Sequence, residues 1–381
     1  MTAPTGTHPG SDTEPPTPAV AAAAKRPTSS RARIRTAVSI LISIGIVVAV
    51  FWYFLPQFTS ISAVWASMRS MTGIELAGLV ALAVWNLATY WFVMVATMPG
   101  LTIPQAAVVT ESSTAVANTV PAGGAIGIAM SYSMYGSWGF SRSRSSVSLL
   151  VSGVWNNFAK LGMPVLALAV LALTGKPSGG RVVLGLIGVA SLAAAIFVFW
   201  LLLRGEESAR RLGLGMARLV SAVRRRFGRP PVAGWELATV KFRGRTIALL
   251  KARWVIITLS TLVSHFSLYV LLLVALRDVG VSEQEVSWAE ALAVFSFARL
   301  LTAIPLTPGG LGIVEIALIT GLAAAGGARA EVAAAVLIFR ALTYVLPIPL
   351  GLATYLFWRR NKSWRRAPGA APRTALVPEQ T

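Results

Sequence analysis

Cysteine is absent from the 381 residues of the chain, and histidine occurs only at His8 and His265. Without cysteine the protein can form no disulfide, no thiolate nucleophile and no cysteine-based metal or redox site. The HExxH motif of zinc proteases and the GxxxxGK[ST] motif of phosphate-binding loops are also missing. We therefore expect no cofactor, no metal and no enzymatic activity.

Acidic residues are scarce, because 14 Asp and Glu stand against 34 Lys and Arg, which gives a formal net charge of +20. In a soluble protein such a balance would favour nucleic-acid binding. Here 55% of the residues are hydrophobic, and the basic residues lie between long apolar runs, as the positive-inside rule requires. The sequence predicts an all-α integral membrane protein that binds no nucleic acid.

A membrane-spanning helix needs about 20 mostly apolar residues. Six uninterrupted runs satisfy this requirement, at 36–55, 75–97, 146–174, 182–203, 254–276 and 332–357. Residues 1–35 form a Pro-, Thr-, Ala- and Ser-rich tail with a basic end, which we expect to be disordered. The chain is thus divided into this tail, a transmembrane domain at 36–357 and a basic tail at 358–381.

Two further apolar stretches, 104–140 and 288–325, are broken near their middles by proline and glycine. The breaks lie at Pro121, Gly123, Gly124, Pro308, Gly309, Gly310 and Gly312. If each stretch enters and leaves on one side, the protein has six full spans and two re-entrant hairpins that open to opposite sides, as in inverted repeats around a midplane site. If each crosses the membrane, there are eight spans. We predict the re-entrant arrangement, with eight spans, or a simple kink or tight turn at each break, as the alternatives.

The distribution of basic residues predicts the orientation. The segment 204–253 carries 13 Lys and Arg, and the tail beyond 357 is basic too. We therefore expect both termini and this segment on the cytoplasmic side of the inner (plasma) membrane. Within it, residues 206–228 interleave apolar and basic side chains, which favours an amphipathic helix on the anionic inner leaflet over a solvated connector.

Ionisable side chains inside spans cost about 2.5–3.5 kcal/mol each on insertion scales. The candidate site residues are Glu111, Asn157, Lys160, Arg299, Glu315 and Arg340. They form either ion pairs that hold helices together or a polar path for a charged group. We expect Lys160, Arg340 and the backbone at 309–310 to converge on one midplane cavity, with Arg299 and Glu315 lining or bracing it. The helix that starts after the second break would add partial positive charge that suits a phosphate.

Two C-terminal motifs carry a family resemblance. Leu306-Thr-Pro-Gly-Gly-Leu-Gly-Ile-Val-Glu315 and Arg340-Ala-Leu-Thr-Tyr-Val-Leu-Pro347-Ile-Pro-Leu-Gly351 resemble the lysylphosphatidylglycerol synthase transmembrane (flippase-like) family, over roughly residues 36–360. The resemblance implies a lipid flippase domain, which in bifunctional members is joined to a cytosolic aminoacyl-transferase domain. The chain ends shortly after its last predicted span, so we expect the translocation half alone.

The first half departs from the family pattern. That pattern resembles Pro-Gly-x-x-Gly-Glu followed by arginine, whereas this chain has Pro121-Ala-Gly-Gly-Ala-Ile-Gly127 with neither charge. Aminoacyl-phosphatidylglycerol specificity is therefore not carried over to this chain.

Three functional hypotheses follow. The preferred one is a lipid translocase that moves an amphiphile with an anionic or phosphate headgroup. The second is a non-transporting scaffold whose basic loop binds anionic lipid or a partner. The third, a lipid-modifying enzyme with Glu111 or Glu315 as base, lacks a visible nucleophile–base pair. Expected partners are membrane phospholipids, anionic inner-leaflet lipid at 204–253 and a separate lipid-modifying enzyme.

Overall fold

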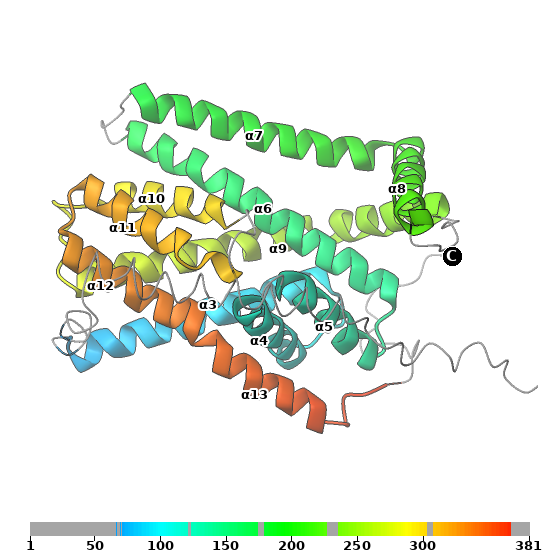
Figure 1. The fold of residues 1–381 in the computed structure, drawn as a ribbon, viewed down its shortest axis with the longest axis horizontal. Coiled ribbons are helices and arrows are strands. Elements are labelled where there is room, and N and C mark those ends of the chain that lie inside the picture. Colours follow the sequence, from blue (N-terminus) through cyan, green and yellow to red (C-terminus); the bar gives the residue numbers. More distant parts are fainter. Residues whose placement is uncertain are drawn as a thin grey trace, which may run out of the picture. The chain divides into compact units, whose positions relative to one another are not determined.

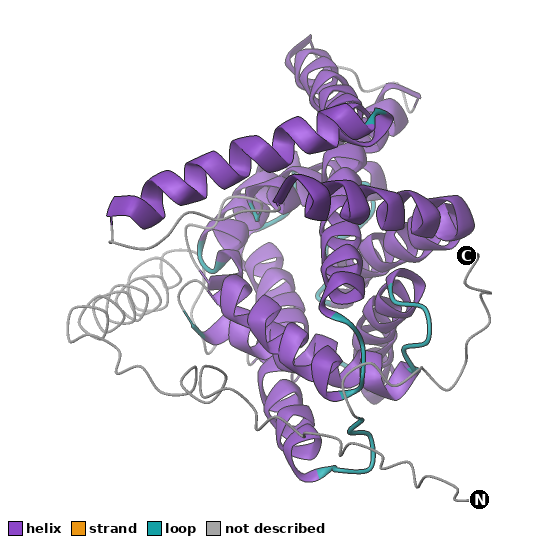
Figure 2. Ribbon diagram, turned by 90° about the vertical axis from the view of Figure 1, so that its right-hand side faces the viewer, coloured by secondary structure: helices purple, strands orange, loops and turns teal. Residues whose placement is uncertain are grey.

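All regular elements that the computed structural model describes are helical (Figures 1 and 2). The structure describes residues 71–120, 123–173, 179–226, 235–302 and 308–366, together with Ala66 and Arg69. The predicted first span at 36–55 and the tail at 1–35 lie outside the described residues. The elements are α3 (Gly73–Thr97), α4 (Ile103–Thr119), α5 (Gly123–Ser137), α6 (Arg142–Leu173), α7 (Gly179–Arg204), α8 (Glu206–Arg226), α9 (Trp235–Asp278), α10 (Trp288–Leu301), η4 (Pro308–Gly310), α11 (Ile313–Ala325), α12 (Arg329–Arg340), the π-helical turn η5 (Ala341–Val345) and α13 (Pro347–Arg360).

Four helical stretches among the described residues are long and apolar enough to cross a membrane: Gly73–Thr97, Arg142–Leu173, Thr239–Asp278 and Arg329–Arg360. They cover four of the six predicted full spans. The predicted span at 182–203 falls in α7. Together with α8, which follows after a bend of 96°, α7 forms a fifth candidate span. The prediction of an all-helical membrane protein is therefore confirmed.

The span predicted at 254–276 is part of a much longer helix. α9 has 44 residues and begins at Trp235, so at 1.5 Å per residue it extends about 66 Å. That is about twice the bilayer core of about 30 Å. The second half of the predicted loop at 204–253 is therefore helical, and basic residues such as Lys241 and Arg243 lie within α9.

Both broken stretches fold as helical hairpins. In the first hairpin (α4 and α5), Gly123 lies directly against the backbone of Val116 and Ala117, and Gly127 lies against Ser113. Later positions of α5 thus contact earlier positions of α4, so the two helices run antiparallel. In the second hairpin (α10, η4 and α11), the two long arms pack together, and Gly321 faces Val294. The breaks are thus tight reversals and not simple kinks.

The order helix, hairpin, helix occurs twice. α3, the first hairpin and α6 are followed later by α9, the second hairpin and the α12–α13 stretch. α3 and α9 pack together and run antiparallel, because Asn86 bonds Ser267 and Val95 accepts from Arg253. Each hairpin packs on the last helix of the other set, since α4 contacts α13 and α10 contacts α6. The two sets therefore form one interlocked core.

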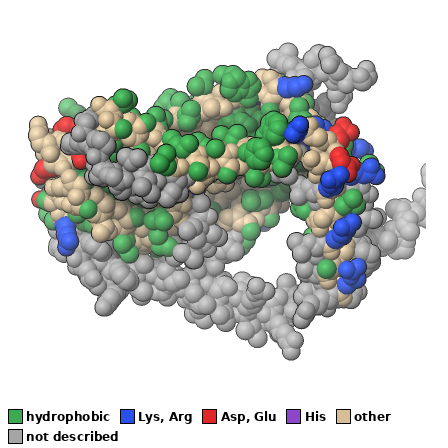
Figure 3. Space-filling view, turned by 90° about the horizontal axis from the view of Figure 1, so that it is seen from above, with side chains coloured by type: hydrophobic (Ala, Val, Ile, Leu, Met, Phe, Trp, Pro, Cys, Tyr) green, Lys and Arg blue, Asp and Glu red, His purple; other side chains and the backbone are tan. Residues whose placement is uncertain are grey.

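The exposed surfaces separate by residue type. α7 presents large apolar side chains, among them Leu186, Phe197 and Trp200. α8 presents the exposed bases Arg210, Arg211, Arg218 and Arg225. In Figure 3, hydrophobic side chains run along the face seen from above, and Lys and Arg gather at the end where Figure 1 places α8. Residues 206–226 are thus helical, within the range predicted as amphipathic.

Candidate functional site

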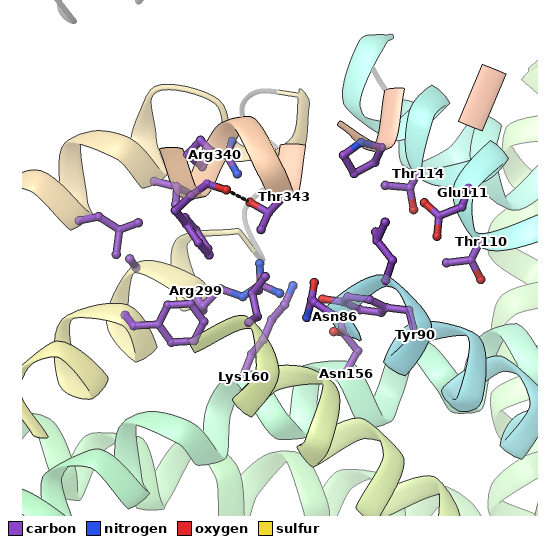
Figure 4. Close-up of a pocket in the computed structure, with 18 residues that line it drawn as sticks. Asn86, Tyr90, Thr110, Glu111, Thr114, Asn156, Lys160, Arg299, Arg340 and Thr343 are labelled. Carbon is purple, nitrogen blue, oxygen red and sulfur yellow. Dashed lines mark hydrogen bonds between the residues drawn. The ribbon is translucent and has the colours of Figure 1, made fainter. Parts of the chain in front are cut away.

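Polar side chains from both helix sets line one cavity of about 230 Å³ between the helices. We call it the central cavity. Its polar wall consists of Asn86, Tyr90, Thr110, Glu111, Thr114, Asn156, Lys160, Arg299, Arg340 and Thr343 (Figure 4). Its apolar wall includes Leu268, Phe295 and Leu318. The cavity is thus a polar compartment inside an otherwise apolar core.

Two bases, Lys160 and Arg299, lie together on one side of the cavity. Among the described residues no carboxylate lies within ion-pair distance of Lys160 or Arg299. The Nε atom of Arg299 is buried and also has no hydrogen-bond partner in that part of the chain. Figure 4 shows Lys160 and Arg299 side by side. Because buried like charges repel one another and are costly to desolvate, this wall is suited to an anion.

Arg340 is held by a carboxylate behind the cavity wall. Its Nε atom donates to Glu315 Oε1 at 2.6 Å, and only 12% and 6% of the two side chains are exposed. The guanidinium lies 4.5 Å above the ring of Tyr344 and donates through Nη2 to the carbonyl of Gly309 at 3.4 Å. Of the alternatives that the sequence left open for Arg340, the structure shows the pair with Glu315.

Glu315 also caps the helix that follows the second break. Its Oε2 atom accepts from the backbone N–H of Gly312 at 2.7 Å. The positive end of α11, expected to face an anionic ligand, is therefore already occupied at Gly312 by this carboxylate. Pro308–Gly310 forms a short turn in which Gly309 has φ 58°, a left-handed conformation that glycine adopts without strain.

The ends of the two hairpins meet next to the cavity. The hydroxyl of Tyr344 donates to the carbonyl of Asn118 at 2.5 Å, and Nδ2 of Asn118 donates to the carbonyl of Tyr344 at 3.1 Å. Gly309 lies against both side chains, so closely that a Cβ atom would collide with the Tyr344 ring. The end of α4, the turn η4 and the π-helical turn η5 thus form a single contact.

The acid of the cavity has a different environment. Glu111 in α4 is only 3% exposed. Its Oε1 atom accepts from the indole Nε1 of Trp91 at 2.7 Å, and its Oε2 atom has no partner among the described residues. Figure 4 places it with Thr110 and Thr114 on the side away from Arg340. The cavity therefore has a basic wall and an acidic wall.

Four of the six predicted site residues line the central cavity: Glu111, Lys160, Arg299 and Arg340. Glu315 lies behind Arg340. Asn157 does not line this cavity, because its side chain is exposed and donates to the carbonyl of Gly153. Asn156 lines the cavity instead. Both positions lie about one turn before Lys160, at i−4 and i−3, so helical spacing alone does not separate them.

Among the glycines of the two breaks, Gly123 permits the close backbone contact inside the first hairpin, whereas a Cβ atom at Gly124 would meet open space. Gly310 and Gly312 have φ values of 73° and 84°. Pro121 lies outside the described residues. Only some of the predicted glycines are therefore required by geometry.

The sequence reasoning missed three polar cavity residues, Asn86 and Tyr90 of α3 and Thr343 of η5. Asn86 joins the two helix sets, because its amide donates to Ser264 and Ser267 of α9. An amide inside an apolar run was the available signal. His265 is buried and its Nδ1 atom contacts the carbonyl of Thr261, but it does not line the cavity. Within the described chain no cluster of His, Asp and Glu could hold a metal ion.

Comparison with known proteins gives one result. The family model described as Lysylphosphatidylglycerol synthase TM region matches residues 40–351. The match covers both hairpins and every residue that lines the central cavity. A search of curated protein sequences finds no match.

Proposed function

Because the chain belongs to the lysylphosphatidylglycerol synthase transmembrane-region family, we propose that it is a lipid translocase of the inner membrane. It would move an amphiphile with an anionic or phosphate headgroup between leaflets. The observation that carries the proposal is a pair of bases, Lys160 and Arg299, on one wall of the central cavity, to which the described residues supply no acidic partner. A buried cation persists in a membrane domain when a counter-charge compensates it, and a lipid phosphate supplies that charge.

The chemistry of the two side chains fits a phosphate. Arg299 offers a planar fork of donors that can bind two oxygens at once, and Lys160 supplies a compact point charge. Asn86, Asn156 and Tyr90 offer further polar atoms on the same lining. Arg340 would brace the wall, since its Nε atom is engaged by Glu315.

We further propose that both hairpins are re-entrant. Their long arms contain between 13 and 17 residues, which at 1.5 Å per residue gives about 20–26 Å. That is shorter than a bilayer core of about 30 Å. The reversal at each break and the meeting of the hairpin ends, where Gly309 lies against Asn118, support two hairpins that enter from opposite sides. The antiparallel pair α3 and α9 is consistent with inverted repeats.

The basic surface of α8 is proposed to contact anionic lipid of the inner leaflet. Exposed Arg210, Arg211, Arg218 and Arg225 lie on a helix that bends sharply away from α7. Arg243 of α9 holds this corner by donating to the carbonyl of Leu203 at 2.9 Å. A juxtamembrane base contributes about 1 kcal/mol of attraction to an anionic surface.

We propose that neither of the two buried acids, Glu111 and Glu315, acts as a catalytic base. Trp91 engages Glu111, and Arg340 and Gly312 engage Glu315. Neither acid has a described hydroxyl, amine or histidine as a hydrogen-bond partner in a nucleophile–base arrangement. A separate enzyme would modify the lipid where modification occurs.

The test of the function is movement of a fluorescent phosphatidylglycerol in proteoliposomes. We expect probe from the inner leaflet to become accessible to a membrane-impermeant quencher outside the vesicle only when the purified protein moves it to the outer leaflet. Protein-free vesicles and vesicles with heat-inactivated protein are the controls. Equal quenching with and without active protein would exclude translocation and leave the scaffold hypothesis.

The proposed orientation is tested on the chain without native cysteine. Gly73 and Gly215 are exposed, and a Cβ atom at either position meets nothing within 4 Å. With both termini and α8 cytoplasmic, we expect an impermeant maleimide added to intact cells to label Gly73→Cys and to spare Gly215→Cys until the cells are lysed. The opposite pattern would reverse the orientation.

A further inference from the structure

Glu111 has the environment of a proton-binding group. Only 3% of this residue is exposed. The only described partner of its carboxylate is the indole N–H of Trp91 at 2.7 Å, and no base in the described part of the chain forms an ion pair with it. An isolated buried carboxylate is costly, and the group avoids this cost by taking up a proton. Glu111 is therefore placed to exist as a neutral acid.

The same cavity contains Lys160 and Arg299, which lack acidic partners within the described chain. An anion bound there experiences repulsion from ionised Glu111 but not from protonated Glu111. The two binding events are therefore linked, and by reciprocity a bound phosphate increases the affinity of Glu111 for a proton by the same factor.

We propose that Glu111 carries a proton together with each anionic headgroup, so that lipid movement is coupled to proton movement in the same direction. This inference rests on the proposed lipid translocation. In the step, an Oε atom of Glu111 takes a proton from the donor side while the phosphate binds Lys160 and Arg299. The O–H bond breaks when the headgroup leaves, and the proton departs to the acceptor side. One proton and one monoanionic headgroup cross as a neutral sum.

A second cavity supplies an entry route for the proton. It has a volume of about 200 Å³, lies along the first hairpin and shares Thr110 and Thr114 with the central cavity. Ser113, Ser131 and Ser152 also line it. A hydroxyl both donates and accepts hydrogen bonds, so a row of hydroxyls can relay a proton. The hydroxyl of Thr110, next to Glu111 in the chain, has no partner among the described residues.

The groups around Glu111 allow the titration to be assigned to it. α13 packs on α4 at Gly351 and presents Thr354 to Ser112. α5 contains no Asp, Glu, Lys or Arg. The ionisable residues that line or brace the central cavity from the other elements are Tyr90, Lys160, Arg299, Arg340 and Glu315. Glu315 is already paired, so Glu111 is the acid of this set that lacks a cationic partner.

The experiment compares wild-type protein with Glu111→Gln in proteoliposomes that carry fluorescent phosphatidylglycerol and an internal pH dye. Gln retains the volume and the oxygen that accepts from Trp91, but it takes up no proton. A gradient of about one pH unit, acidic on the donor side, should enrich the probe about tenfold in the opposite leaflet for wild type, because one proton per lipid makes the two ratios equal. Proton and probe should move together, and a clamped membrane potential should have no effect.

Glu111→Gln should show no gradient-driven enrichment of the probe and no proton flux. The control is Glu331→Gln, at an exposed acid on the first turn of α12, which should behave as wild type. Lipid movement that is insensitive to the gradient in wild type, or enrichment by Glu111→Gln, would overturn the coupling and leave the translocase proposal intact.

An infrared measurement keeps the inference testable if no protein moves lipid. At a pH where the protonated-carboxyl band of wild type has half its intensity in acid, addition of short-chain phosphatidylglycerol in detergent should increase this band, and the change should be missing in Glu111→Gln. A wild-type spectrum that does not respond to the lipid would overturn the proton site directly. Absence of transport with a normal infrared response would reject the translocase and retain the linkage.

Discussion

Replacing both Lys160 and Arg299 by methionine is expected to abolish movement of the anionic probe, while the protein still inserts and folds. A hydrogen bond to a charged group contributes about 1.5–3 kcal/mol. Each single replacement should therefore weaken headgroup binding by about 10- to 150-fold, since 1.4 kcal/mol corresponds to a factor of ten. The double variant loses both contacts and should resemble protein-free vesicles in the quenching assay.

Folding should survive this change for an electrostatic reason. Neither base has a carboxylate partner in the described chain, so its removal leaves no acid without a counter-charge. Removal also relieves the mutual repulsion of two cations in one cavity, and the midpoint of thermal unfolding in detergent should stay level or increase. The matched control is Lys251→Met with Arg218→Met, at two exposed bases outside the cavity. Transport that persists in the Lys160 and Arg299 double variant would remove the basic wall from the mechanism.

The location of the site could be predicted from the cost of intramembrane charge. Lys160 and Arg299 lie on apolar helices that gain nothing from a lipid-facing base, so their side chains had to face the interior, and both line the cavity. Which side chain of a helix lines the cavity could not be predicted to within one residue. Asn156 and Asn157 are neighbours of equal polarity, and only the packing of α6 decides that the first lines the cavity.

The breaks in the two hairpins were evident from proline and glycine, but their reversal was not. Whether a broken helix continues or doubles back depends on contacts such as Gly123 against Val116, and these join residues on both sides of the break. The partner of Arg340 was equally open. Glu315 reaches it because it occupies the third position of α11, where it also caps Gly312. The start of α9 was obscured because basic residues continue a helix as readily as a loop.

The bracing role of Arg340 leads to the last expected result. Arg340→Leu alone should destabilise the protein by about 3–5 kcal/mol, because it leaves the buried carboxylate of Glu315 without its partner. The additional change Glu315→Gln should recover most of this loss. Gln has no charge to compensate, and its side-chain oxygen can still accept from the N–H of Gly312, as Glu315 does at 2.7 Å.

Two measurements separate a bracing role of Arg340 from direct contact with the headgroup: the unfolding midpoint in detergent and probe movement in proteoliposomes. Both are made on wild type, Arg340→Leu, the double variant and Arg329→Leu. If Arg340 acts through its pair with Glu315, transport should fall in Arg340→Leu and return with stability in the double variant. Arg329→Leu, at the exposed start of α12, should leave both quantities unchanged. A double variant that is stable but inactive would show that the guanidinium itself contacts the headgroup, because the only function then missing would be the charge that faces the cavity. In that case Arg340 would join Lys160 and Arg299 as a third phosphate ligand, and its ion pair would serve to aim it.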